Sequence, residues 1–218
     1  MRYFLIKEKR SSKSHTYPQV SGFDLTLKDA QLLGGIGNEP VDFSQLPPIR
    51  LYLDEDSSFT DLVSQSFLSA RGLLISDHFF SVIEDYLNED FQHAPAHLIL
   101  GNEEKIYHWL HPICDYDQFI DFDRTSFAMI NALTEEISEI KIKDYETLLT
   151  KRLHMSGLNK LITKEQTISF TKPLGNKHLF LFTLNVAGIY ISESLAQIIK
   201  EKNFTGIEFI EGLHRFTK

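Results

Sequence analysis

Alternating and helical spacings of apolar residues divide the chain into many short strands and a few helices. The aromatic and aliphatic run at 3–6 and the alternation at 49–53 predict strands. Spacings of three and four residues predict helices over 59–70 and 144–154. Further strands are predicted at 107–113, 126–133, 167–170 and 178–184. The last of these is almost wholly apolar, which is typical of a central strand.

One strand–helix pattern occurs twice, and it gives the clearest structural prediction. Gly72 opens an apolar run that ends at Ser76, and an amphipathic segment follows. The same order begins at Gly188 and passes through Ser192, 116 residues further along the chain. A serine at the start of a helix accepts a hydrogen bond from a backbone N–H of the first turn. Each copy therefore predicts a strand–helix–strand unit, over about 72–100 and about 188–210.

The order of the elements indicates the fold class. Strands and helices mix without strict alternation, which favours an α+β fold over a doubly wound sheet. We predict a mixed or antiparallel sheet that holds both strand–helix–strand units, with a further helix near 144–154. Because 218 residues can bury a single core, we assign 1–218 to one domain.

Composition adds limits to this picture. The chain has 22 Lys and Arg against 30 Asp and Glu, a net charge of −8, which argues against a general binder of nucleic-acid backbones. Its one cysteine, Cys114, cannot form an internal disulfide and fits a reducing compartment. No window approaches the roughly 20 apolar residues that span a bilayer. These features predict a soluble protein of the cytoplasm.

The acidic excess is concentrated in one segment. Residues 84–124 contain ten acids and two bases, so this segment carries the whole net charge of −8. Aromatic residues are interleaved with the acids, as in a protein-binding surface with apolar anchors inside a charged rim. Such a segment also steers association with a basic partner. The candidate partner-binding residues are Glu103, Glu104, Trp109, Asp115, Tyr116, Asp117, Asp121 and Asp123.

A cluster of histidines and acids within 93–123 offers an enzymatic alternative, a small metal-dependent hydrolase. His93 and His97 are four residues apart, His108 and His111 are three apart, and nitrogen ligands suit zinc. A proline between the first two histidines breaks the helix that would place them on one face. If the second pair lies on the predicted strand, its members point to opposite faces. We therefore predict no metal and no cofactor.

Other catalytic motifs have little support. Cys114 lies among acids, which raise the pKa of a thiol and disfavour the reactive thiolate. The glycines within 34–37 lack the third glycine and the following lysine of a phosphate-binding loop. Neighbouring aspartates such as Asp121 and Asp123 lack the spacing of a calcium loop. We therefore predict that the protein has no catalytic residues and is not an enzyme.

The carboxyl-terminal part carries a motif that resembles a known family. The motif begins at His178-Leu179-Phe180 and continues at 188–195, where the sequence is Gly-Ile-Tyr-Ile-Ser-Glu-Ser-Leu. It ends at 204–209 with Phe-Thr-Gly-Ile-Glu-Phe. This order is similar to the closing motif of immunity proteins from bacterial polymorphic toxin systems. Residues 74–77 and 107–126 resemble the middle portion of that family.

The resemblance covers about 70–215 and leaves 1–70 as a variable amino-terminal part. It departs from the family after Phe180, because Leu181 follows where the family often has an arginine. The resemblance implies a non-catalytic inhibitor that binds a cognate toxin domain in the cytoplasm and blocks it. It implies no membrane contact and no direct contact with nucleic acid. A general interaction domain without a toxin partner stays open, as does the choice between monomer and homodimer.

Overall fold

The computed structural model describes residues 2–9, 18–65, 68, 72–155, 157–164, 167–172, 174–184, 187–211 and 215–217. Its strands are β1 (Tyr3–Glu8), β2 (Val20–Phe23), β3 (Ile49–Leu53), β4 (Leu62–Val63), β5 (Leu73–Ser76), β6 (Phe91–Leu100), β7 (Glu103–Pro112), β8 (Phe127–Asn131), β9 (Ile137–Ile140), β10 (Asn159–Thr163), β11 (Thr167–Ser169), β12 (Leu179–Phe182), β13 (Gly188–Ser192), β14 (Ile207–Ile210) and β15 (Arg215–Thr217). Its α-helices are α1 (Leu27–Gly35), α2 (Asp77–Ile83), α3 (Tyr145–His154) and α4 (Glu193–Glu201), and its 3-10 helices are η1 (Phe43–Gln45), η2 (Glu84–Tyr86) and η3 (Tyr116–Phe119).

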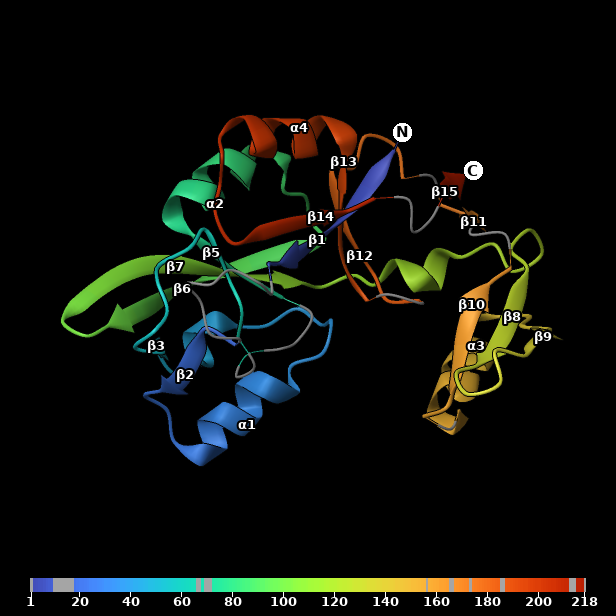
Figure 1. Ribbon diagram of the computed structural model, residues 1–218, viewed down its shortest axis with the longest axis horizontal. Coiled ribbons are helices and arrows are strands. Elements are labelled where there is room, and N and C mark those ends of the chain that lie inside the picture. The colour runs from blue at the N-terminus through green and yellow to red at the C-terminus, as the bar shows by residue number, and fades with distance from the viewer. Residues whose placement is uncertain are drawn as a thin grey trace.

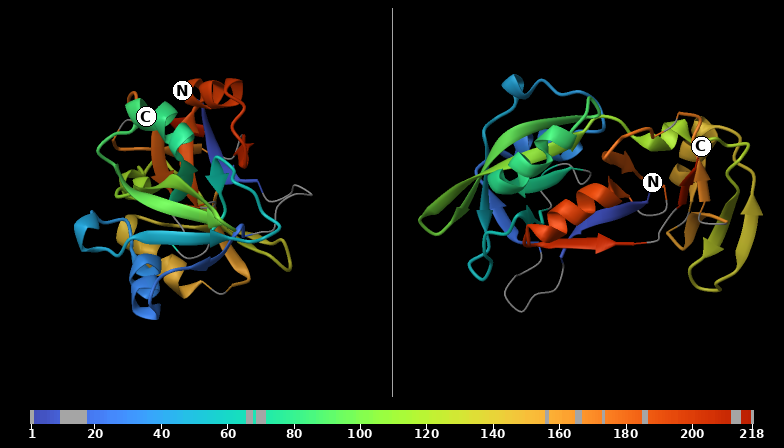
Figure 2. Two further views of the ribbon diagram at one scale, coloured as in Figure 1. Left: turned by 90° about the vertical axis from the view of Figure 1, so that its left-hand side faces the viewer. Right: turned by 90° about the horizontal axis from the view of Figure 1, so that it is seen from above.

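The strands form a six-stranded sheet in the order β2-β3-β6-β7-β5-β4, a four-stranded sheet in the order β12-β13-β1-β14, and two smaller sheets, β10-β8-β9 and β11-β15. Mixed sheets together with separate helices confirm the predicted α+β class. Figures 1 and 2 show α2 and α4 side by side above the two larger sheets, while α3 and the β10-β8-β9 sheet lie together at one end of the long axis. No helix in the described ranges is long and apolar enough to cross a membrane.

Both predicted strand–helix–strand units are present, and they share one topology. In the first, β5 and β6 run parallel to each other, because both pair antiparallel with β7 between them. In the second, β13 and β14 both pair antiparallel with β1. A further antiparallel strand flanks each unit, β4 beside β5 and β12 beside β13. We call β4, β5, α2, β6 and β7 the first repeat, and β12, β13, α4, β14 and β1 the second repeat.

The hydrogen bonds at the two helix caps repeat as well. In the first repeat, the Ser76 hydroxyl accepts from a backbone N–H of the first helical turn at 3.0 Å, and the Ser76 N–H donates to the Asp61 carbonyl at 2.8 Å. In the second repeat, the Ser192 hydroxyl accepts from the first turn at 3.3 Å, and the Ser192 N–H donates to the His178 carbonyl at 2.8 Å. The predicted serine caps are therefore confirmed, and each ties its helix to the flanking strand.

Close packing explains why a glycine stands at the start of the strand before each helix, Gly72 before β5 and Gly188 in β13. A Cβ atom at Gly72 would lie 2.4 Å from Trp109 Nε1, and a Cβ atom at Gly188 would lie 2.5 Å from Leu5 Cδ1. Trp109 and Leu5 occupy equivalent positions in the central strands, since Trp109 pairs with Leu74 and Leu5 pairs with Tyr190. The glycines leave the space into which these two side chains pack.

Most of the other predicted elements are confirmed, namely the strands at 3–6, 49–53, 107–113, 126–133 and 167–170 and the helix near 144–154. The helix predicted at 59–70 is wrong over the residues that the structure describes, and its remaining positions lie outside them. Leu62 and Val63 instead form β4, and both side chains are fully buried against the core. Pairing with β5 over this short stretch decides the extended conformation.

The strand predicted at 178–184 is present as β12, but it lies at the edge of its sheet and not at the centre. It is nonetheless apolar on both faces, because each face packs against a different hydrophobic core. Leu179 and Leu181 face the core between α2 and α4, and Phe180 and Phe182 face the core on the opposite side of the sheet. A run of apolar residues therefore indicated burial on two faces, not a central position.

The distribution of the cores leaves one sheet face open. One core lies between α2, α4 and both large sheets, and a second lies on the other face of the four-stranded sheet. A third core lies on the face of the six-stranded sheet that carries Leu51, Leu98 and Trp109. Leu33 of α1 belongs to this core. On the opposite face, α2 contacts β5 and β7, and the outer parts of β3, β6 and β7 extend beyond it (Figure 1).

Candidate partner-binding surface

Four of the eight candidate residues are buried, so their assignment to a partner-binding surface is wrong. Trp109 and Tyr116 are fully buried, and their rings belong to two of the hydrophobic cores. Asp115 and Asp117 are buried as well. Acidic residues are tolerated inside a protein where other groups satisfy their charge and hydrogen bonds. Contacts with distant parts of the chain provide this for Asp117.

Asp117 fixes the end of β12 against α3. Its Oδ1 atom accepts hydrogen bonds from the backbone N–H groups of Thr183 and Leu184 at 2.9 and 3.1 Å. Its Oδ2 atom accepts from Arg152 Nη1 at 2.9 Å and from the Thr183 hydroxyl at 2.6 Å. Arg152 belongs to α3, 35 residues further along the chain. The role of Asp117 is therefore structural.

Asp90 is a further buried acid of the 84–124 segment. It accepts hydrogen bonds from the Tyr116 hydroxyl at 3.1 Å and from Lys177 Nζ at 2.5 Å. Burial, followed by the charge of Asp90, raises the pKa of Tyr116 well above its usual value, so the phenol stays protonated. Part of the acidic excess seen in the sequence is thus paired inside the molecule and is not available to a partner.

The other four candidate residues are accessible, but they lie in two separate places. Glu103 and Glu104 begin β7 at the tip of the long β6–β7 hairpin. Asp121 and Asp123 lie in the turn before β8. Figure 1 places the hairpin tip and β8 at opposite ends of the molecule. The predicted acidic segment therefore does not form one continuous surface.

Glu104 belongs to the uncovered sheet face, which is the best-defined surface for a partner. The strand registers place alternate residues of β3, β6 and β7 on this face. No described element covers it, and Tyr52 and Ile106 are 38% and 56% exposed. We define the open face as these seven residues: Arg50, Tyr52, Pro95, His97, Ile99, Glu104 and Ile106.

An ion-pair network holds the centre of the open face. Arg50 donates two hydrogen bonds to the Glu104 carboxylate, at 2.9 and 3.2 Å, and His97 Nδ1 lies 2.7 Å from Glu104 Oε1. The hydrogen bonds from Arg50 lower the pKa of Glu104, so this carboxylate is charged at neutral pH. Its charge is matched by Arg50, and the accessible side chains around the pair are largely apolar. The open face is thus an apolar surface with a fixed polar centre.

The predicted histidine cluster is divided between two faces. His108 and His93 both pack against the Phe80 ring. The ring centroid of His108 lies 4.0 Å from that of Phe80, and the centroid of His93 lies 4.4 Å from it. His111 points to the opposite face, where its Nε2 atom lies 3.0 Å from the Glu39 carbonyl oxygen. The prediction that His108 and His111 face opposite ways is confirmed. Within the described ranges, no group of three or more His, Cys, Asp or Glu is placed to hold a metal ion.

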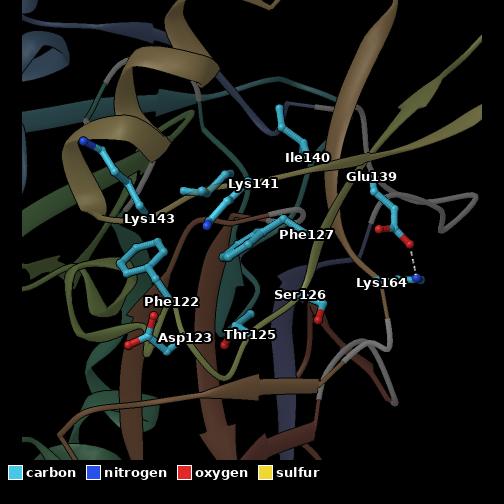
Figure 3. A pocket seen from close by; sticks show the side chains of 11 residues that line it. Phe122, Asp123, Thr125, Ser126, Phe127, Glu139, Ile140, Lys141, Lys143 and Lys164 are labelled. Atoms are coloured by element: carbon cyan, nitrogen blue, oxygen red, sulfur yellow. Dashed lines mark hydrogen bonds and ion pairs between the residues drawn. The ribbon is translucent and has the colours of Figure 1, made fainter.

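A cavity of about 600 Å³ lies elsewhere, between the turn before β8 and strand β9 (Figure 3). Phe122 and Phe127 stack along one wall with centroids 5.8 Å apart. Its charged lining consists of Asp123, Glu139, Lys141, Lys143 and Lys164. Lys164 pairs with Glu139. Because acids and lysines are interspersed, this cavity has little preference for a ligand of either sign.

In comparisons with known proteins, no family model matches this chain, and no curated protein matches it at a significant level. The function therefore has to be inferred from the accessible surface and from the resemblance carried by the sequence motif.

From the sequence, Glu104 was named as a candidate partner-binding residue, but none of the other residues of the open face was. Arg50 and Tyr52 were detectable in principle, because alternation at 49–53 predicts a strand with one exposed face. Ile106 gave no such signal, since it stands beside acids and a lysine in the sequence. The pairing of β3 with β6 brings Arg50 to Glu104 across 54 residues of sequence, which local patterns do not report.

Proposed function

We propose that this protein is a non-catalytic immunity protein, which binds and neutralises a cognate bacterial toxin domain through its open face. The observation that carries the proposal is the uncovered face of β3, β6 and β7, with Tyr52 and Ile106 accessible around the Arg50–Glu104 pair. Aromatic and aliphatic anchors around a fixed polar centre are typical of protein interfaces.

Burial of the open face by a partner would contribute to the affinity of the complex. Complete burial of an isoleucine side chain contributes about 1.5–3 kcal/mol, so Ile106 and Tyr52 together supply a large share of a specific interface. The Arg50–Glu104 geometry exists before binding, which reduces the ordering cost that a partner has to offset. A partner bound to this rigid sheet would be blocked sterically, and inhibition would require no chemistry from this chain.

The toxin as partner is supported by the sequence motif. The residues that carry the resemblance, at 188–195 and 204–209, form β13, the start of α4, and β14. They are elements of the second repeat, and their buried apolar side chains, such as Ile191 and Leu195, belong to the core between α2, α4 and the two large sheets. The motif thus supports membership of a structural class, while the open face supports protein binding, and the two together support an immunity function.

The proposal predicts that a toxin domain is encoded beside this gene, and the absence of one would count against it. The test is co-purification with that domain and survival of cells that express both proteins. The double variant Tyr52→Ala/Ile106→Ala should bind at least about tenfold more weakly, which corresponds to about 1.4 kcal/mol, and should protect poorly. Leu133→Ala/Ile137→Ala is the matched control, because these residues are 74% and 61% exposed at the other end of the molecule. Equal protection by both double variants would refute the assignment of the open face.

A further inference from the structure

Strand β7 extends past its neighbour on one side. Its residues 107–110 pair with β5, where Ser76 lies opposite Tyr107 and ends that strand. Residues 103–106 pair with β6 alone, and no described residue pairs with their other edge. A strand edge of this kind presents backbone N–H and C=O groups that another strand can pair with.

A groove follows this unpaired edge. Its cavity has a volume of about 360 Å³ and is lined by Phe59–Asp61 and by Ser76–His78, two segments that are hydrogen-bonded to each other through Asp61 and Ser76. Lys105, Ile106 and Tyr107 of β7 line the remaining side. Phe59 stacks with Tyr107 at 6.5 Å between centroids. The groove thus combines a free strand edge with an apolar recess beside it, which we call the edge groove.

The charges around the edge groove favour a basic occupant. Asp77 stands at its rim with a side chain that is 74% exposed, and Glu103 is exposed at the start of the same strand edge. The nearest base, Lys105, has its ammonium group 4.3 Å above the centre of the Phe59 ring. Acids therefore outnumber bases along the edge.

The second repeat shows how the same position is satisfied within the chain. Its central strand begins at Tyr3, the equivalent of Tyr107, and the preceding residue is Arg2. The Arg2 carbonyl accepts a hydrogen bond from the Glu193 N–H at 2.9 Å, and the Arg2 guanidinium lies 3.7 Å from the Glu193 carboxylate. Glu193 is the equivalent of Asp77. In the second repeat an arginine of the chain meets this acid. In the first repeat Asp77 Oδ1 lies 3.0 Å from His108 Nε2, its side chain stays largely exposed, and the place equivalent to Arg2 holds Ile106.

We propose that the edge groove binds an extended, basic segment of another protein as an added strand, with backbone hydrogen bonds to residues 103–106 and a lysine or arginine beside Asp77. Alternate side chains of the added strand would lie beside Phe59 on one face of the sheet and beside Ile106 on the other. Two copies of this chain would bring Asp77 and Glu103 of each copy together, so the charges disfavour self-association at this edge. The inference goes beyond the proposed function, because it holds for any partner with such a segment.

The test uses the full chain and the peptide Lys-Val-Lys-Val-Lys-Val-Lys, blocked at both ends, at low ionic strength. Backbone amide NMR shifts report where the peptide binds and how tightly. We expect shifts at 103–106 and 77–78, and affinity at least about tenfold lower for Asp77→Lys/Glu103→Lys. The matched control, Glu136→Lys/Glu208→Lys, makes the same charge change at exposed residues outside the groove and should stay within about twofold of the wild type.

A second peptide, N-methylated at every backbone nitrogen, keeps the lysine charges but has no backbone N–H group to donate. We expect it to lose binding at the edge groove. The proposal is overturned if the methylated peptide binds equally well, if the two double variants behave alike, or if the parent peptide shifts no amide of the groove. Neither peptide contains a toxin sequence, so these results are independent of the immunity assignment.

Discussion

The two repeats share their internal packing and differ in what extends from it. Both have a glycine at the start of the unit, a serine cap and a tyrosine that begins the pairing of the central strand. In the first repeat, β6 and β7 each run for ten residues and β3 pairs alongside, whereas the equivalent strands β14 and β1 have four and six. The open face and the edge groove both lie on these additions. Shared residues thus stabilise the fold, and the added residues carry the candidate binding surfaces.

The largest expected difference between the repeats concerns their flanking strands, β12 and β4. A polar side chain from outside the repeat binds the end of each. Asp117 binds the end of β12, and Gln19 binds Ser64 at the end of β4, with its amide oxygen 3.2 Å from the Ser64 N–H. Asp117→Ala should lower the free energy of unfolding by about 3–5 kcal/mol, because it leaves Arg152 without its buried partner. Gln19→Ala should cost about 1–3 kcal/mol. Urea unfolding measures both, and similar losses would contradict this distinction.

The two glycines provide the next test, because their surroundings differ in stiffness. A Cβ atom at Gly72 would also lie 2.7 Å from the Leu110 carbonyl oxygen, which is backbone, whereas at Gly188 it meets only the flexible Leu5 side chain. Gly72→Ala should therefore destabilise the protein by about 3 kcal/mol and Gly188→Ala by about 1 kcal/mol. Thermal or urea unfolding gives the ranking. A larger loss at Gly188 would show that the repeats are not packed as described.

A smaller difference between the repeats is expected in how their stability depends on pH. Burial lowers the pKa of His111 and of His93 below the usual 6.5, and both belong to the first repeat. The unfolded chain then binds more protons, so this contribution to stability is complete above about pH 6.5 and is lost as the pH falls toward the lowered native values. We expect His111→Phe to flatten the fall in unfolding free energy between about pH 7 and pH 5. An unchanged slope would count against a neutral, buried His111.

The sequence predicted the repeats because their signals are local. Gly72, Ser76 and their counterparts act within a few residues, through close packing and helix capping. Helix α1 was not predicted from the sequence. Leu33 is its only buried residue, so its apolar residues do not recur at the three- and four-residue spacing of a helix with one buried face. β4 was mistaken for part of a helix because only its pairing with β5 makes it extended.

The candidate site was predicted less well, because burial of charge depends on distant partners. Nothing near Asp117 in the sequence indicates that Arg152 will reach it, and nothing near Asp90 indicates Lys177. Counting charges along 84–124 therefore combined buried, paired acids with accessible ones. Glu103 and Glu104 stayed at the surface, where the hairpin extends past α2, and they mark the region that the structure redefines as the open face and the edge groove.

Hydrogen–deuterium exchange on the complex with the toxin domain that the proposed function predicts tests most directly whether the additions to the first repeat form the partner surface. The account predicts slower exchange on binding in residues 49–53 and 95–106, with no change in β14 of the second repeat. Slower exchange confined to β8, β9 and α3, or equal changes in both repeats, would contradict it.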